Sequence, residues 1–488
     1  MRRQTGTMIP LRRILLCALP CAFLLASSPA PAVSADEAAF AQWFTGGTLR
    51  WDYYHCGTAA EEHIAHDAFR LEGDWPGSRT QLIDEANLGV YLFQVVDAGT
   101  GTLIYSRGFC SIYGEWETLE EAEQGTWRAF HESQRFPEPN GPVKLQLGKR
   151  AEDGSFHTIH VQELDPSAAM IDRSTPAERG KVWTVFEHGP ASEKMDLLVL
   201  GDGYTLPEAA KFHADVQRLI DDLFEVEPFR ARKGDFNVRA IDLPADESGI
   251  TDPRRGIWRR SPLGLSFNAF GWDWYVLTEK NRALREIAAQ APYDALVLIF
   301  NGRKYGGGGI FNLWAIVSAD SAASSFVVAH ELGHSLAGLA DEYYTNQVSY
   351  GEGNGLEPWE PNITALRDPT ALKWRDLVES STPIPTPWDQ HRYDEAIASA
   401  RRERQRLTET GYTDEQMEAL FRREGEAAVG ALAAEPYAGK VGAFEGAGYH
   451  AEGLYRPCLD CIMFSRSAKA FCPVCARAIE RAIDLCAR

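Results

Sequence analysis

Positive charge is scarce in this chain. Its 488 residues include 49 lysines and arginines against 69 aspartates and glutamates, which gives a formal net charge of −20. Such an acidic surface repels the phosphates of nucleic acids and the headgroups of anionic membranes. We therefore expect neither nucleic acid nor an anionic membrane surface as a partner.

Long apolar segments are missing beyond the N-terminus. Residues 1–35 contain four arginines, the apolar run ILLCALPCAFLLA and the small-residue stretch PAVSA. This run is too short to span a bilayer, and the order of its parts is that of a cleavable export signal. We predict a signal peptide over residues 1–35 and an exported protein, periplasmic or secreted, with no membrane span after signal removal. An uncleaved anchor and a lipid attached to Cys21 are the alternatives.

Cysteine is absent from residues 111–457, but it is dense near the C-terminus. CLDC and CPVC are two CxxC pairs separated by ten residues. Four thiolates at this spacing are typical of a structural zinc site, whereas an oxidising compartment would favour two disulfides. Export favours the disulfides slightly, and Cys56 could pair with Cys110. The residues of the two CxxC pairs are Cys458, Cys461, Cys472 and Cys475.

The residue pattern divides the mature chain into two parts. Residues 36–165 are rich in short β-branched and aromatic runs, with a hairpin signal at Asp153-Gly154, and predict an all-β, sandwich-like domain. Residues 166–180 have the composition of a linker. From residue 181 to 488, apolar strands such as MDLLVLGDGYT and DALVLIFNG alternate with helical segments. This alternation predicts an α/β domain.

One helical segment, SSFVVAHELGHSLAGL, carries a metal-binding pattern. We expect Ser324 or Ser325 to cap this helix and Gly338 to end it. At 3.6 residues per turn, His330 and His334 point the same way and can bind one Zn²⁺. Glu331 lies beside the first histidine, where it could act as general base on a zinc-bound water.

The spacing is uncommon by chance. From the composition, a His-acid-x-x-His pattern would occur about 0.04 times in such a chain. The simpler interpretation is a half-buried helix whose two histidines make ordinary hydrogen bonds. A catalytic zinc usually has a third protein ligand. Asp341 and Glu342 follow the helix, and we prefer Asp341 because a tight turn favours the nearer, shorter acid.

Several longer segments resemble one known family, the igalysins, which are IgA-specific metallopeptidases of the metzincin clan. The resemblance rests on HELGHSLAGLADEYY, LVLGDGYT, YGGGGIFNLWA and VGAFEGAGYHAEGLYRPCLDCIMFSRSAKAFCPVCARAI. It also covers GTLRWDYYHCGTA in the first part, which looks like the family's preceding β-sandwich domain. Here the metal motif reads HExxHxxxGxxD, with one residue more before its glycine than the usual metzincin pattern.

The resemblance implies a metzincin-like catalytic domain of the α+β or α/β class, with a mixed sheet and an active-site helix. In that fold Met463 would lie beneath the metal as an apolar floor without touching it. The strand within GGGGIFNLWAIVS would form the upper rim of the cleft and pair with extended substrate. Tyr449 or Tyr455 could supply a hydroxyl donor to the transition state.

These observations together predict an exported zinc-dependent endopeptidase that acts on a protein or peptide. Zn²⁺ would be held by His330, His334 and Asp341, and Glu331 would activate the zinc-bound water. A second, structural zinc at the cysteines remains possible. The alternative is a non-catalytic, zinc-containing module that binds proteins or glycoproteins on the same scaffold. The family name suggests IgA as substrate, although no residue encodes it.

Overall fold

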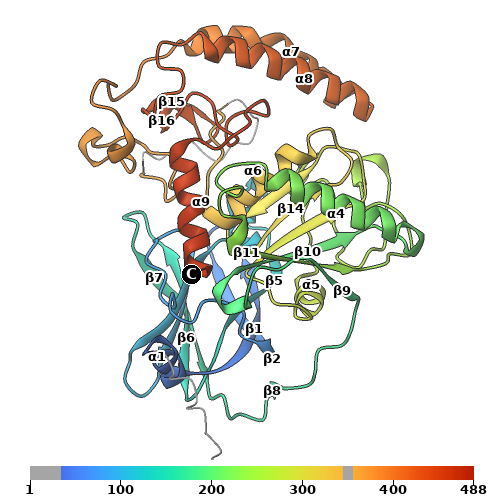
Figure 1. Ribbon diagram of the computed structural model, residues 1–488, viewed down its shortest axis with the longest axis vertical. Coiled ribbons are helices and arrows are strands. Elements are labelled where there is room, and N and C mark those ends of the chain that lie inside the picture. Colours follow the sequence, from blue (N-terminus) through green and yellow to red (C-terminus); the bar gives the residue numbers. More distant parts are fainter. Residues whose placement is uncertain (1–34, 345–355, 488) are drawn as a thin grey trace, which may run out of the picture.

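The computed structural model describes residues 35–344 and 356–487 (Figure 1). Residues 1–34 of the predicted signal peptide lie outside this part. The described chain has a mixed α+β fold with four sheets. No helix within the described ranges is both long and apolar enough to cross a membrane.

The N-terminal part contains two four-stranded sheets, drawn in blue and cyan in Figure 1. Every strand of both sheets contributes to one shared core, in which Trp51, Phe93 and Phe136 are completely buried. The predicted hairpin at Asp153-Gly154 is confirmed, because β6 and β7 pair antiparallel across it. The strand orders are β5 (Arg128–Pro139), β1 (Phe44–Gly57), β2 (Glu62–Asp74), β8 (Ile171–Asp172) and β4 (Leu103–Phe109), β3 (Tyr91–Asp97), β6 (Val143–Arg150), β7 (Phe156–Leu164).

This part is not purely β. Helix α1 (Ala35–Trp43) precedes the first strand, and α2 (Ile112–Trp116) and α3 (Glu120–Glu123) lie between β4 and β5. Tyr113 and Trp116 of α2 pack into the same core as strands of the following part. The expected all-β domain is therefore not confirmed, and the two parts of the chain share apolar contacts.

A six-stranded mixed sheet organises the following part. Strands β10, β11, β12 and β14 are parallel to one another, while the edge strands β13 and β9 pair antiparallel with β14 and β11. All eight residues of β10 are buried, as expected for a strand covered on both faces. The order is β13 (Gly307–Ile310), β14 (Trp314–Ser318), β12 (Ala295–Phe300), β10 (Met195–Asp202), β11 (Phe236–Asp242), β9 (Lys181–Phe186).

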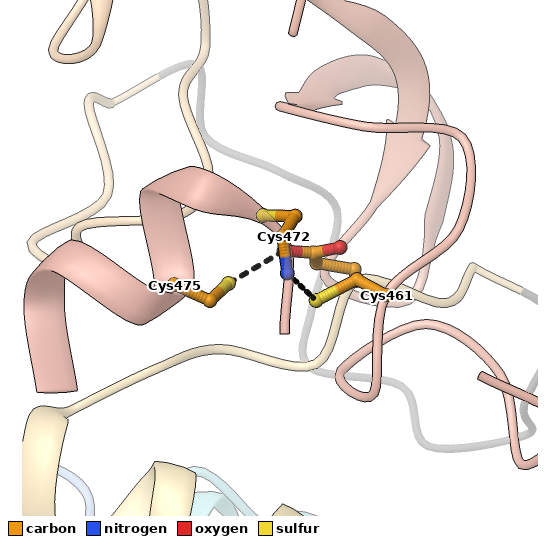
Figure 2. Close-up of side chains that lie close together, drawn as sticks. Cys461, Cys472 and Cys475 are labelled. Atoms are coloured by element: carbon orange, nitrogen blue, oxygen red, sulfur yellow. Dashed lines mark hydrogen bonds between the residues drawn. The ribbon is translucent and has the colours of Figure 1, made fainter. Parts of the chain in front are cut away.

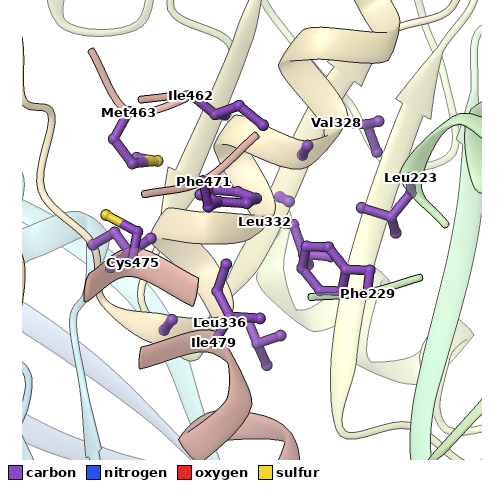
Figure 3. Packing of buried hydrophobic residues seen from close by; sticks show 14 of the residues in the cluster. Leu223, Phe229, Val328, Leu332, Leu336, Ile462, Met463, Phe471, Cys475 and Ile479 are labelled. Atoms are coloured by element: carbon purple, nitrogen blue, oxygen red, sulfur yellow. The ribbon is translucent and has the colours of Figure 1, made fainter. Parts of the chain in front are cut away.

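Helices cover both faces of this sheet. Alternate residues of β10 face opposite ways: Leu197 packs with α4 (Ala209–Leu223) and α6 (Ser324–Ala337), and Leu198 packs with α5 (Asn281–Ala288) and α2. Figure 3 shows Val328, Leu332 and Leu336 of α6 packed near Leu223, Phe471 and Ile479. The apolar side of α6 is thereby fixed against the sheet core.

The C-terminal end of α6 is as predicted from the sequence, but its N-terminal cap is not. Gly338 ends the helix in the left-handed conformation, with φ of 61°, as predicted. The predicted serine cap is wrong. Ser324 is the first residue of the helix, and its hydroxyl donates to the carbonyls of Ser318 and Ser321 instead.

Much of the C-terminal part lies above the sheet in Figure 1, and its last helix descends beside the sheet. Helices α7 (Gln390–Thr410) and α8 (Asp414–Ala433) are rich in charged residues and pack against each other. A two-stranded sheet of β15 (Phe444–Ala447) and β16 (His450–Arg456) follows. The last helix, α9 (Pro473–Cys486), packs on α6. It brings the C-terminal cysteines close to the helix of the histidine motif.

Candidate metal centre and catalytic site

The two histidines of α6 face each other one helical turn apart. Their Nε2 atoms are 3.2 Å apart. The Nδ1 atom of His330 lies 3.0 Å from the carbonyl oxygen of Ile462, and that of His334 lies 2.5 Å from the carbonyl of Leu339. Because a carbonyl only accepts, the proton of each neutral ring is held on Nδ1. Both Nε2 lone pairs are therefore left to face a common point.

Asp341 is the third group at this point. Its Oδ1 atom lies 3.1 Å from Nε2 of His330 and 3.4 Å from Nε2 of His334. This buried oxygen has no hydrogen-bond partner in the described part of the chain. Ligand atoms on a tetrahedral Zn²⁺ are about 3.3 Å apart, so the three atoms have the spacing of three zinc ligands. The donor set fits a divalent metal.

The electrostatics of this group also favour a positive charge between the three side chains. Burial alone would lower the pKa of His334, but the Asp341 carboxylate outweighs it and raises the pKa to about 9. Burial alone would raise the pKa of Asp341, but the two histidines hold it well below its usual range. A proton and a metal ion therefore compete for the same place.

The segment that carries Asp341 is fixed by hydrogen bonds on both sides. Asn362 accepts from the backbone N–H of Ala340 and donates to the carbonyl of Ala340 and to Glu342. The backbone N–H of Glu342 donates to the carbonyl of Met463. The sequence did not indicate Asn362, because its partners lie 20 and 22 residues away.

The structure separates the two acids that were candidates for the third ligand. Asp341 joins the histidines, whereas the fully buried Glu342 turns toward three cysteines. The same turn that brings Asp341 to the histidines thus sends its neighbour to a second cluster.

Glu331 lies between the histidines and the edge strand β13. Its side chain is half-buried. Burial raises the pKa of its carboxyl group, and this effect outweighs the opposite effect of His330 and His334. A Cβ atom on Gly307 would lie 2.8 Å from Oε1 of Glu331, and one on Gly309 would lie 2.5 Å from its backbone oxygen. Only glycines allow the strand to run this close to the helix.

Met463 and the two candidate tyrosines take different places. Met463 is fully buried, and its Sδ atom would be 3.0 Å from a Cβ on Gly333, on the inner side of α6. The hydroxyl of Tyr449 donates to Oδ2 of Asp341, so this tyrosine lies at the candidate metal centre. Tyr455 instead bonds Glu445 through its hydroxyl.

A cleft of about 2470 Å³ opens beside these residues. It is lined by β13 and α6 and also by residues of the N-terminal part, including Glu115 of α2. The hydroxyl of Tyr275 donates to Glu115, and burial raises the pKa of Glu115 to about 7. The sequence gave no signal for Glu115, because it lies far from the histidine motif in the chain.

The C-terminal cysteines are all free thiols. Cys461, Cys472 and Cys475 come together (Figure 2), and they form a compact group with Glu342. Cys458 is also buried and interacts with the side chain of Cys472, but it is not one of the four residues whose ligand atoms all lie within 4.8 Å of one another. Cys56 and Cys110 are unpaired as thiols too, so the expected disulfides are not confirmed.

Comparison with known families gives two matches. The family model described as IgA Peptidase M64 matches residues 184–483. The model described as Peptidase M64 N-terminus matches residues 39–161. No curated protein matches the chain significantly.

Proposed function

Because the chain belongs to the IgA peptidase M64 family, and is therefore a metallopeptidase, we propose that it is an exported zinc endopeptidase centred on α6. Its substrate is a protein or peptide, as the family implies. The export rests on the predicted signal peptide at residues 1–35, of which residues 1–34 lie outside the described part of the chain. The observation that supports the site most is the convergence of two imidazole nitrogens and one carboxylate oxygen within 3.4 Å of one another.

In this proposal His330, His334 and Asp341 hold the metal. A bound Zn²⁺ would supply Lewis-acid chemistry, lowering the pKa of the attacking water and polarising the scissile carbonyl. The carbonyls of Ile462 and Leu339 fix the two imidazole rings in the tautomer that a metal requires. These contacts orient the ligands before any ion arrives.

Glu331 is the proposed general base. It takes a proton from the water as the water attacks the scissile carbonyl, and it then passes a proton to the leaving amine. Its position beside both histidines and against β13 supports this role. Tyr449, which bonds Asp341, is the proposed hydroxyl donor to the developing oxyanion.

The substrate would bind along β13 as an added strand. Gly307 exchanges backbone hydrogen bonds with Trp274 and Val276 on the side of β13 away from β14. Backbone groups of alternate residues point the same way, so Gly309 directs its N–H and C=O to that side as well. An extended peptide could pair there, directly beside Glu331. Immunoglobulin A, which the family description names, is the first substrate to test.

The fold and domain boundaries belong to the same proposal. We propose a metzincin-like catalytic domain over residues 181–488, with Met463 as the apolar floor beneath the metal. It follows a sandwich-like domain at 36–165 and a linker at 166–180. The mixed sheet, its antiparallel edge strand and the helix α6 support this assignment.

A non-catalytic binding module on the same scaffold is the rival function. It has no need of a carboxylate at position 331 or of glycines that bring β13 against it. The experiment that separates the two uses purified mature protein, its chelator-treated form, the zinc-reconstituted form and His334→Ala. Each is incubated with immunoglobulins and with a complex proteome, and new peptide termini are identified by mass spectrometry.

We expect new termini with the native and zinc-reconstituted proteins only. Termini that persist after metal removal or in His334→Ala would contradict the proposed metal centre. A metal-loaded protein that produces no new termini from either substrate set would favour the binding module.

A further inference from the structure

A second cluster of potential metal-ligand side chains lies next to the centre formed by His330, His334 and Asp341. Ligand atoms of Glu342, Cys461, Cys472 and Cys475 all lie within 4.8 Å of one another. We propose that these four residues form a structural zinc site, separate from the centre at His330, His334 and Asp341. This site differs from a four-cysteine site, because a carboxylate takes the place of Cys458.

Burial makes the cluster a closed site. Glu342, Cys461 and Cys475 have no exposed surface, and Cys472 is 5% exposed. Four protein ligands without an open position are typical of structural zinc, whereas catalytic zinc keeps one position for water. The cluster therefore has no room for a substrate, and a metal bound there would stabilise the fold.

The hydrogen bonding of the Glu342 carboxyl group is a second, independent indication of a bound cation. Its Oε1 atom accepts from Sγ of Cys475 at 3.1 Å and from Nδ2 of Asn362 at 3.1 Å. Its Oε2 atom is buried and has no hydrogen-bond partner among the described residues. A fully buried carboxyl group is costly unless a partner satisfies both oxygens. A metal ion shared with three thiolates would be such a partner.

The chemistry of the donors selects the metal. Three sulfur ligands disfavour Mg²⁺ and Ca²⁺, which prefer oxygen, and suit Zn²⁺. Sulfurs on a tetrahedral zinc are about 3.8 Å apart, given Zn–S bonds of about 2.3 Å. This separation falls within the 4.8 Å spread of the ligand atoms.

The cluster joins three segments that also build the candidate catalytic site. Glu342 directly follows Asp341, and Cys461 directly precedes Ile462, whose carbonyl accepts from His330. Cys472 precedes α9 and Cys475 lies in its first turn, as Figure 2 shows. A metal in the cluster would hold Asp341 and the Ile462 carbonyl in position beside the histidines of α6. Loss of that metal should therefore weaken metal binding at the histidines.

The first test is made in a His330→Ala/His334→Ala background, which removes the proposed catalytic metal. Metal content is measured by mass spectrometry after dialysis, and free thiols are counted by alkylation under denaturing, non-reducing conditions. We expect about one zinc per chain to remain and the cluster thiols to be unoxidised. Wild-type protein should hold about two zinc ions, and this measurement does not depend on how any variant folds.

The second test compares three variants in the same background: Glu342→Gln, Cys475→Ser and, as the control, Cys458→Ser. We expect Glu342→Gln and Cys475→Ser to lose the remaining zinc, and Cys458→Ser to retain it. Cobalt substitution gives a second readout, because three thiolates bound to Co²⁺ produce intense charge-transfer absorption. This absorption should survive in Cys458→Ser and disappear in Cys475→Ser.

Several results would overturn the proposal. One is that the double-histidine variant binds no zinc and the wild-type protein holds none at the cluster. Another is that the cluster cysteines are joined as disulfides. Zinc retained by Glu342→Gln but lost by Cys458→Ser would instead establish a four-cysteine site. The test is independent of catalysis, so an inactive wild-type enzyme that keeps the cluster zinc would refute only the proposed function.

Discussion

Asp341 owes its position to residues that are distant in the sequence. Gly338 adopts the left-handed conformation that ends α6, and the chain then returns toward the histidines. Asn362 bonds the residues on either side of Asp341, and Tyr449 bonds its carboxylate directly. These contacts, rather than the local sequence, determine which acid reaches the histidines.

Replacement of Asn362 by alanine should therefore weaken the metal centre without removing a ligand. The change deletes three hydrogen bonds around residues 340–342. We expect the affinity for zinc at the histidines to fall by about 10- to 100-fold, as for other groups that orient ligands. Competition with a chromophoric chelator measures it. Asn140→Ala, in an exposed loop, is the control and should leave the affinity unchanged.

A buried histidine in the N-terminal sheets predicts a dependence of stability on pH. Burial would lower the pKa of His55, but the carboxylates of Glu132 and Glu62 outweigh it and raise the pKa to about 9. The folded-state pKa is thus above the unfolded value of 6.5. The stabilisation is fully present below pH 6.5 and is lost as the pH rises through 9.

Denaturant unfolding of wild type and His55→Gln at several pH values tests this dependence. The stability difference between the two should be largest near pH 6 and shrink toward pH 9.5, values chosen to be about half a unit outside the titration range. A difference that stays constant or grows with pH would show that His55 is neutral in the folded protein.

At the scale of elements, β13 and α6 form one unit because glycines remove the side chains between them. A Cβ on Gly309 would lie 2.5 Å from the backbone oxygen of Glu331 and 2.8 Å from Cβ of His334. Neither neighbour is the flexible end of a side chain. The strand must therefore shift away from the helix when this glycine is replaced.

Gly309→Ala should displace the edge strand from the proposed catalytic glutamate. We expect kcat/KM to fall by roughly 100-fold, the effect of a misplacement of about 1 Å. Kinetics on a peptide found in the product assay would measure it, alongside the thermal midpoint. Gly234→Ala, where a Cβ meets nothing within 4 Å, is the control. Equal activity of the two variants would argue against substrate pairing along β13.

The sequence predicted the elements whose signals are local. The spacing of His330 and His334 follows from the helical period, and Gly338 marks the end of α6. The sequence did not predict that Ser324 bonds backward rather than capping the helix, because its acceptors are carbonyls of a preceding turn. We also expected a single strand within GGGGIFNLWAIVS, whereas this stretch forms the antiparallel pair β13 and β14.

The long-range parts of the site could not be predicted. Glu115 reaches the cleft from α2 and pairs with Tyr275, which lies 160 residues further along the chain. Similarly, Glu342 meets Cys475 across 133 residues. No periodicity or spacing in a single sequence reports such contacts, because they depend on how whole elements pack.

At the scale of the whole molecule, the N-terminal part is built into the catalytic part. Tyr113 and Trp116 of α2 share a core with Leu198 and Leu200 of β10. Hydrogen bonds also cross between the parts, such as that from Arg135 to the carbonyl of Tyr293. The N-terminal sheets therefore support the face of the central sheet opposite α6.

Deletion of residues 1–165 should consequently leave an unstable catalytic part. The truncated chain would expose the face of β10 and α5 that α2 covers. We expect aggregation or strong binding of a hydrophobic dye, together with loss of activity. A truncated chain that remains monomeric, cooperative in unfolding and active would show that the catalytic part folds on its own.

The most direct test of the account is the turnover of Glu331→Gln measured together with its metal content. The substitution keeps the shape of the side chain and removes only its ability to accept a proton. The account predicts a metal content equal to that of the wild type and a fall in kcat of about 100- to 10,000-fold. Wild-type turnover in a fully metal-loaded Glu331→Gln protein would contradict it, because the proposed base would then be dispensable.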